Sequence, residues 1–389
     1  MTSSSRAAGV FIVAAESSGD ALGADLIGAL RARDPLLRIE GVGGAAMAQA
    51  GIASAIDIAG LAVLGLIDGL KAYGRVVRLA EAAANAAIAA NPACVTLIES
   101  WGFTLRVAQR IRARAPHIKL VKYIGPQVWA TRPGRARTLA RTVDHLICIH
   151  DFEVPFYAPY GLACTVCGHP AIGRYRPGDG AAFRARHDLG GAPLLLVLPG
   201  SRRSEVARTG PTLWRAAAMA RTQETKLALV AADAVAAQAR AQAPADAVIV
   251  AEMEKDDAFA AAAAALAASG TVTTEVALQG APVVVGYKLG WITWALARLF
   301  LYKSKYATLM NVAARREVAP EFIQTRFTAD NLARAAGALL RDPAARAAQI
   351  EAQNAALAAM GRGGRPAADI AAEAVLAVIA DQPRAPSGT

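Results

Sequence analysis

Short apolar runs alternate with longer helical stretches through most of this chain. The predicted strands of the first half lie at 10–14, 38–41, 94–98, 120–124 and 146–149, and the predicted helices at 21–33, 76–91, 103–114 and 135–141. This alternation is typical of a parallel sheet with helices on both faces, because strands buried on both sides read as continuous apolar runs. The sequence therefore predicts an α/β fold.

The alternation pauses once and then resumes, which indicates two domains. The pause at 168–180 is rich in Gly, Pro and Arg, as interdomain linkers are. Further predicted elements lie at 194–198, 203–220, 227–230, 248–250, 257–266, 273–278 and 282–286, followed by Ala-rich helices to Ala380. We expect two doubly wound, Rossmann-like domains facing a cleft. They span 9–171, with the helix at 365–380 as a candidate to pack back on this domain, and 193–360; residues 382–389 are expected to be a disordered tail.

Composition narrows the classes of function. The chain has 389 residues and a net charge of +11, which favours anionic partners. No run reaches the roughly 18 apolar residues of a membrane span, and the start lacks a secretory pattern, so we expect a cytoplasmic protein. Nucleic acid is not an expected partner, because no module combines basic and aromatic residues.

The four cysteines fit strand positions better than a disulfide or metal framework: Cys94, Cys148, Cys164 and Cys167.

Polar and glycine-rich segments follow the predicted strands of the first domain. Parallel sheets bind ligands beyond the carboxyl ends of their strands, so these segments are candidate site residues. They are Glu16–Asp20, Gly41–Gly44, Glu99–Gly102 and Gly125–Trp129.

The predicted strand at 194–198 ends in a glycine turn that carries cations. Gly200 and Ser201 are followed by Arg202 and Arg203. Free backbone amides at the start of a helix attract anions, most commonly phosphate. A surface turn with solvated arginines is an equal alternative for this segment taken alone.

A second small-residue turn, Ser269-Gly270-Thr271, also precedes a predicted helix, with Glu275 one turn inside it. Thr271 as a helix N-cap explains the turn as well as a ligand does. A carboxylate at Glu275, however, could accept both vicinal hydroxyls of a ribose. With Arg202 neutralising phosphate, the two turns predict a nucleotide diphosphate site.

Other cofactors and metals are weakly supported. Gly41–Ala46 fits the dinucleotide fingerprint, but the helix it would open soon meets Gly51 and no acid follows at the required distance. A P-loop motif and an acidic D-x-D metal motif are both missing from the sequence. We expect neither a cofactor nor a metal, with Arg202 and helix dipoles stabilising the leaving diphosphate.

The stretch 290–305 is the strongest amphiphile of the chain. It is too short to span a bilayer and has more cations than a core helix needs, so an interfacial helix on anionic lipid is predicted. The expected membrane-contacting residues are Trp291, Trp294, Leu299, Phe300 and Lys303. The segment 60–71 could act in the same way, or be a buried loop.

These residues together make the chain resemble the lipid-A-disaccharide synthases, which are two-domain inverting glycosyltransferases of the GT-B type (glycosyltransferase family 19). The resemblance is collinear from about Val10 to Gln324. It rests on the motifs Glu16-x-Ser18-Gly19-Asp20, Gly41-Val-Gly-Gly with Met47 and Gly51, Pro126-x-Val128-Trp129-Ala130-x-Arg132, Phe152-Glu153 with Phe156-Tyr157, Gly168-His169-Pro170, Leu198-Pro-Gly-Ser-Arg202 with Glu205, Ser269-Gly-Thr271 with Glu275, Asn311, and Glu321-x-x-Gln324.

The resemblance implies the reaction and its participants. The family joins a UDP-linked 2,3-diacylglucosamine to 2,3-diacylglucosamine 1-phosphate, releasing UDP. The resemblance implies a nucleotide-sugar site at Gly200, Ser201, Arg202, Ser269, Gly270, Thr271, Glu275, Asn311 and Gln324. It implies an acceptor side at Ser18, Gly19, Asp20, Gly43, Gln127 and Trp129. The expected catalytic residues are Glu99 and Arg202. A peripheral position on the cytoplasmic face of the inner membrane and a homodimer are further expectations.

The loop that carries the family's general base departs from the pattern. The family has D-x-P-D-F-N where this chain has Glu99-Ser-Trp-Gly-Phe-Thr104, so Glu99 replaces one acid and Gly102 the other. A base needs reach and a suitable pKa, which Glu99 can supply. Glu99 could instead cap the following helix or pair with Arg106. A paralogue acting on another lipid-linked sugar, and a non-catalytic nucleotide-sugar or lipid-binding descendant, stay open as alternatives.

Overall fold

The computed structural model describes residues 9–58, 69–268, 270, 272–288 and 305–381. The chain divides into two compact units, residues 1–170 with 364–389, and residues 171–363. Each unit holds a six-stranded sheet whose strands all pair in parallel. The predicted α/β fold is therefore confirmed.

The sheet of the first unit has the order β2-β1-β3-β4-β5-β6. Its strands are β1 (Gly9–Val13), β2 (Arg38–Val42), β3 (Cys94–Ile98), β4 (Lys119–Tyr123), β5 (His145–Cys148) and β6 (Ala163–Val166). Its helices are α1 (Ser17–Arg33), α2 (Ala45–Gln49), α3 (Gly69–Ala90), α4 (Trp101–Arg114), α5 (Arg135–Ala140), α6 (Val154–Tyr157) and α17 (Ala367–Ala380).

Alternate residues of each central strand enter two different cores. Phe11 and Val13 pack in the core that includes α3 and α4, whereas Val10 and Ile12 pack in the core that includes α1 and α17. This is the period-two pattern of a sheet covered on both faces. The continuous apolar run of β1 thus has a direct cause, because neither face of the strand meets water.

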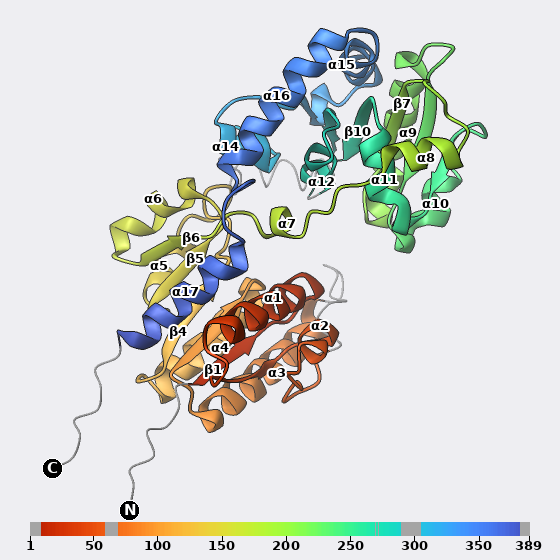
Figure 1. The fold of residues 1–389 in the computed structure, drawn as a ribbon. Helices are drawn as coiled ribbons and strands as arrows, with labels where there is room; N and C mark the ends of the chain where they lie inside the picture. Colours follow the sequence, from red (N-terminus) through yellow and green to blue (C-terminus); the bar gives the residue numbers. More distant parts are fainter. Residues whose placement is uncertain (1–8, 59–68, 269, 271, 289–304, 382–389) are drawn as a thin grey trace, which may run out of the picture. The chain divides into compact units, whose positions relative to one another are not determined.

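Helix α17 lies far along the chain but completes the first unit. It packs beside α1 and against β4 (Figure 1). The guanidinium of Arg33 on α1 bridges Asp369 at 2.9 Å and Glu373 at 3.2 Å, both on α17. These ion pairs are partly exposed and contribute little free energy, so buried residues such as Ala371 and Val375 hold the helix in place.

The sheet of the second unit has the order β12-β11-β10-β7-β8-β9. Its strands are β7 (Leu194–Leu198), β8 (Lys226–Val230), β9 (Val248–Val250), β10 (Ala264–Ala268), β11 (Val283–Tyr287) and β12 (Glu321–Ile323). Its helices include α8 (Gly180–Arg186), α9 (Arg203–Ala220), α10 (Ala236–Arg240), α11 (Lys255–Ala261), α12 (Val272–Leu278), α14 (Leu309–Ala314), α15 (Ala329–Arg341) and α16 (Pro343–Ala359); α7 (Pro170–Gly173) stands at the boundary between the units.

One predicted element is wrong. The single element expected at 257–266 is two: α11 ends at Ala261 and β10 begins at Ala264. Alanine favours helix in isolation, but all five residues of β10 are buried between β7 and β11, and tertiary context overrides that propensity.

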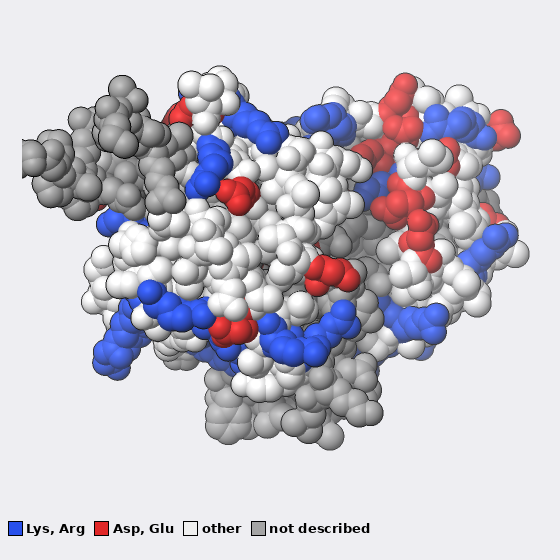
Figure 2. Space-filling view, turned by 90° about the horizontal axis from the view of Figure 1, so that it is seen from below, with Lys and Arg blue, Asp and Glu red and all other residues white. Residues whose placement is uncertain are grey.

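On the face that Figure 2 draws, lysine and arginine side chains stand in separate groups with acidic side chains among them. Many arginines are engaged locally, as Arg186 is by Glu254 and Asp257. Among the described helices, none is long and apolar enough to cross a bilayer.

Candidate functional site

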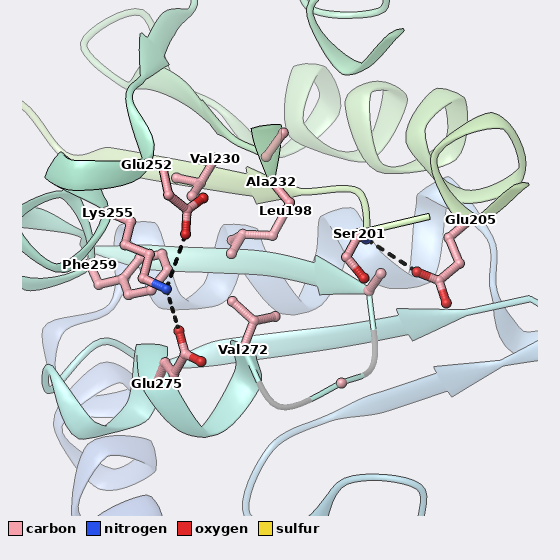
Figure 3. Close-up of a pocket in the computed structure, with 14 residues that line it drawn as sticks. Leu198, Ser201, Glu205, Val230, Ala232, Glu252, Lys255, Phe259, Val272 and Glu275 are labelled. Atoms are coloured by element: carbon pink, nitrogen blue, oxygen red, sulfur yellow. Dashed lines mark hydrogen bonds and ion pairs between the residues drawn. The ribbon is translucent and has the colours of Figure 1, made fainter. Parts of the chain in front are cut away.

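A cavity of about 190 Å³ opens at the carboxyl edge of the second unit's sheet. Residues at the ends of β7, β8 and β10 line it, joined by side chains from α9, α11 and α12 (Figure 3). The lining residues are Leu198, Gly200, Ser201, Glu205, Val230, Ala231, Ala232, Glu252, Lys255, Phe259, Ala268, Gly270, Val272 and Glu275. This is the edge at which open parallel sheets bind their ligands.

The turn after β7 requires glycine. Gly200 has φ +119°, and a Cβ there would lie 2.8 Å from the Cβ of Glu205. The turn places Ser201 and Arg202 immediately before α9, as the sequence predicts for an anion site. The Arg202 side chain is 78% exposed and does not line the cavity.

A carboxylate of the chain itself occupies the amides of this turn. Oε2 of Glu205 accepts from the backbone N–H of Ser201 at 3.2 Å and of Arg202 at 3.3 Å. The Arg202 guanidinium lies 3.2 Å from Oε1 of Glu205, and the Tyr287 hydroxyl donates to the same oxygen at 3.1 Å. Burial and the Glu205 charge raise the pKa of Tyr287, which keeps that hydroxyl protonated as a donor. An anion that binds these amides must therefore compete with Glu205.

Across the cavity, Lys255 stands between two acids. Its ammonium lies 3.3 Å from Glu252 and 3.3 Å from Glu275 (Figure 3). Burial lowers the pKa of Lys255, but the charges of Glu275 and Glu252 outweigh it and leave the pKa above its usual value. The pair holds Glu275 at the cavity wall with one oxygen already engaged.

In the first unit, Glu99 and Ser18 meet at the carboxyl edge of the sheet. Glu99 follows β3, and Ser18 lies in the first turn of α1, after the neighbouring strand β1. The Ser18 hydroxyl donates to Oε2 of Glu99 at 2.6 Å. A Cβ on Gly19 would lie 3.7 Å from the same oxygen, at ordinary contact distance, so Gly19 lies directly beside the carboxylate.

The described residues show Glu99 in neither of its two alternative structural roles, capping helix α4 or pairing with Arg106. Ser100 occupies the N-cap position of α4, and Arg106 directs its guanidinium at the carbonyl of Gly102. Helix α4 begins at Trp101, so most of the loop at 99–104 forms its first turn. The Glu99 carboxylate is therefore free of both predicted structural roles and faces α1.

Asp20 has a defined structural task. Its carboxylate is almost fully buried and accepts the backbone N–H groups of Gly44 at 2.6 Å, Ala46 at 2.8 Å and Met47 at 3.2 Å. It thereby closes the start of the short helix α2. A Cβ on Gly43 would lie 3.0 Å from this carboxylate and 2.3 Å from the Met47 sulfur, which explains the glycine in the motif.

Residues 10–375 match the family model described as lipid-A-disaccharide synthetase. The chain belongs to this family.

Individual relatives agree with the lipid-A-disaccharide synthetase assignment over nearly the whole chain. The lipid-A-disaccharide synthase of Rhodospirillum centenum is 38% identical over 379 residues, covering 95% of this chain and 94% of that protein. That of Ruegeria pomeroyi is 38% identical over 383 residues, with 94% of each covered.

Solved structures of other proteins are similar to this member of the lipid-A-disaccharide synthetase family in their fold. MnaA of S. aureus bound to UDP has a TM-score of 0.63 at 12% identity, covering 97% of this chain and 99% of that one. The UDP-GlcNAc 2-epimerase of Neisseria meningitidis bound to UDP-GlcNAc gives 0.61 at 11% identity, with 95% and 99% covered. The calicheamicin glycosyltransferase CalG4 gives 0.55 at 15%, with 97% and 99% covered. At these identities the likeness concerns the fold, which is the α/β GT-B type.

Two family residues expected at the nucleotide-sugar site are buried away from the cavity lining. Asn311 is fully buried and bonds Ala319 and Glu321 through its amide nitrogen and the N–H groups of Val318 and Ala319 through its oxygen. Gln324 is 4% exposed and has φ +54°. The Asn311 bonds tie α14 to residues 318–321, and neither Asn311 nor Gln324 is among the residues that line the cavity.

The remaining expected residues fall into two groups. Trp129 packs edge-on against Phe152, with ring centroids 5.5 Å apart, and Gln127 is exposed. Ser269, Thr271 and the membrane-contacting set Trp291, Trp294, Leu299, Phe300 and Lys303 lie outside the described residues.

Sequence reasoning missed three charged residues at these edges. Glu252 and Lys255 follow β9, a three-residue strand of mixed burial, and no glycine turn marks its carboxyl end. Lys122 lies inside β4, where its neighbours Val121 and Tyr123 make the segment read as an ordinary apolar strand. In the described part of the chain, no group of three or more His, Cys, Asp or Glu side chains could hold a metal ion.

Proposed function

We propose that this chain is an inverting glycosyltransferase that forms the lipid A disaccharide. Its donor would be a UDP-linked 2,3-diacylglucosamine, and its acceptor 2,3-diacylglucosamine 1-phosphate. The observation that carries the proposal is the 38% identity to lipid-A-disaccharide synthases over 95% of the chain. The runner-up activities, a paralogous transferase and a non-catalytic binding protein, are not favoured by these relatives.

The second unit would bind the donor. The turn Gly200–Arg202 and the start of α9 offer backbone N–H groups and a guanidinium to the diphosphate. The Glu205 carboxylate now on those amides would be displaced toward the Tyr287 hydroxyl, 3.1 Å from its other oxygen. Glu275, one oxygen of which faces Lys255, would accept ribose hydroxyls.

The first unit would supply the base. Glu99 would take the proton of the acceptor's primary hydroxyl as that oxygen attacks the anomeric carbon of the donor. The bond from the anomeric carbon to the diphosphate breaks as the new glycosidic bond forms, and UDP departs with the electron pair. Attack from the face opposite UDP inverts the configuration. The negative charge that develops on UDP is what Arg202 and the amide donors would stabilise.

Both lipid substrates reside in a bilayer, so we also propose peripheral membrane binding through residues 290–305 on the cytoplasmic face of the inner membrane. The mixture of tryptophans and cations in that stretch supports interfacial binding. Co-sedimentation with anionic vesicles tests it. High salt, or Trp291→Ser with Trp294→Ser, should release the protein, because both surface charge and shallow insertion contribute. Binding indifferent to both treatments contradicts the proposal.

The direct test of the activity is mass spectrometry of the product made by purified protein from the two diacyl sugars. We expect the mass of the disaccharide 1-phosphate together with equimolar UDP. UDP release only with a different acylated sugar would favour the paralogous transferase. UDP binding without UDP release would favour a binding protein.

A further inference from the structure

Lys122 is a buried lysine beneath the loop of Glu99. Its side chain leaves the sheet on the face covered by α4 and is 3% exposed. Its ammonium donates to the main-chain carbonyl of Glu99 and, at 2.8 Å, to the hydroxyl oxygen of Thr104. The Thr104 hydroxyl donates in turn to the Glu99 carbonyl at 2.7 Å. Two buried donors thus converge on one carbonyl oxygen.

The backbone at this carbonyl is strained. Glu99 has φ +44° and Ser100 has φ +40°, and consecutive left-handed residues other than glycine persist only where their surroundings enforce them. The N–H of Glu99 is fixed by the carbonyl of Tyr123 at 3.0 Å. Lys122 and Thr104 fix its carbonyl from the other side. Because φ sets the direction of the Cα–Cβ bond, these contacts determine where the carboxylate points.

The charge of Lys122 acts on the same group. The acids that face it are Glu99, at the end of β3, and Glu16, at the end of β1. Burial lowers the pKa of Lys122 to about 7, although both acids act to raise it. Attraction to these two acids therefore helps to hold the Lys122 ammonium beneath the Glu99 loop.

We propose that Lys122 is a positioning residue for the transfer reaction, which holds the Glu99 backbone in its left-handed conformation and so aims the carboxylate at the acceptor. This rests on the proposed function, in which Glu99 is the general base. Lys122 does not touch substrate in this assignment. Its action passes through the Glu99 carbonyl.

The test compares Lys122→Met with Lys119→Met, a lysine of the same strand with no such contact. Single-turnover transfer at saturating donor is measured across a range of acceptor concentrations, with UDP affinity alongside. Lys122→Met should lose about 10²-fold in rate, as a misplaced reacting group does. With the acceptor varied, the loss should persist at saturating acceptor, because the orientation of the Glu99 carboxylate changes while acceptor binding does not. UDP affinity and the Lys119→Met variant should match the wild type.

A second pair of variants covers the case in which Lys122→Met does not fold. Thr104→Val removes the other donor to the Glu99 carbonyl and should slow transfer, whereas Thr104→Ser keeps the hydroxyl and should restore the rate. Slower transfer in Lys122→Met that saturating acceptor restores to the wild-type rate would mark a merely structural lysine and overturn the proposal, as would a wild-type rate in Thr104→Val.

The Glu99→Gln variant distinguishes a failure of the Lys122 positioning role from a failure of the Glu99 base assignment. If this variant is inactive while Lys122→Met keeps the wild-type rate, the positioning role alone fails. If Glu99→Gln transfers at the wild-type rate, the base assignment fails and the positioning role with it.

Discussion

The Ser18 hydroxyl and the Glu99 carboxylate are joined by a 2.6 Å hydrogen bond between residues that are 81 positions apart in sequence. The bond ties the first turn of α1 to the end of β3. At the N-terminus of a helix, the backbone dipoles favour a negative charge. Ser18, which the sequence predicts on the acceptor side, therefore orients the carboxylate of Glu99 through this bond.

Glu99→Gln should abolish most of the transfer and leave donor binding intact. The change preserves shape and removes the base, so we expect a loss of about 10²–10⁴-fold in single-turnover rate at saturating donor. UDP affinity, measured by calorimetry, should stay at the wild-type value because Glu99 belongs to the first unit. Ser18→Ala should show a smaller loss in the same direction. A wild-type rate in Glu99→Gln would show that the proton goes elsewhere.

Arg202→Ala should weaken UDP but not uridine. Loss of this guanidinium should remove about 2–4 kcal/mol of transition-state stabilisation, as removal of other charge stabilisers does. Arg203→Ala is the matched control, because it removes a second exposed arginine one position further on. Equal effects of the two substitutions would reduce the role of Arg202 to general surface charge.

Glu275→Gln should weaken uridine and UDP by the same factor. A carboxylate that accepts ribose hydroxyls contributes about 1.5–3 kcal/mol to either ligand. Lys255→Met should have a smaller effect, within about 1 kcal/mol, because its pair with Glu275 is partly exposed. Calorimetry with both ligands checks this. A loss confined to UDP would place Glu275 at the phosphates instead.

Transfer should persist in EDTA. No acidic motif in the sequence marks a divalent metal site, and the cationic role is assigned to Arg202 and the amide donors before α9. The measurement is UDP release before and after chelation, with added Mg²⁺ as a third arm. Activity lost on chelation and restored by Mg²⁺ would show that a metal stabilises the leaving diphosphate.

His150→Leu should make the protein more resistant to acid. Burial, and then the nearby His169, lower the pKa of His150 to about 3, and among the described residues neither ring nitrogen has a hydrogen-bond partner. The unfolded state therefore binds more protons than the folded state between pH 3 and 6.5. Stability from the neutral ring is complete above pH 6.5 and is lost as pH falls toward 3.

Urea unfolding at pH 7 and pH 4.5 measures this effect. The wild type should lose about 2 kcal/mol more than His150→Leu between the two values. His117→Leu, at an exposed histidine, is the control and should lose as much as the wild type. An unchanged pH dependence in His150→Leu would mean that the ring is protonated or hydrated in the folded state.

The central strands were predictable because their burial is visible in the sequence. β1, β3 and β7 are runs of apolar residues, and burial on both faces leaves no polar alternation to obscure them. β6 and β12 are short edge strands with mixed burial, and no such signal marks them. β10 consists almost wholly of alanine, whose preference for helix misled the prediction.

The site was predictable only in part, and for a physical reason. Strand ends locate Glu99, Ser18 and Gly200, since topology alone brings such ends to one edge. What a side chain contacts there depends on packing that no spacing encodes. The burial of Lys122 and the placement of Glu205 on the amides of Ser201 and Arg202 both belong to this second kind.

The return of α17 to the first unit bears on how the protein is made. Residues 1–170 leave the ribosome before the second unit, yet Ala367–Ala380 is the last element of their fold. During that interval the nascent sheet lacks the helix that packs on the face of Val121, Tyr123 and Ile147. The first unit therefore cannot finish folding as it emerges. It completes its core only after the whole second unit has been made, and until then this apolar strip must be kept from aggregating.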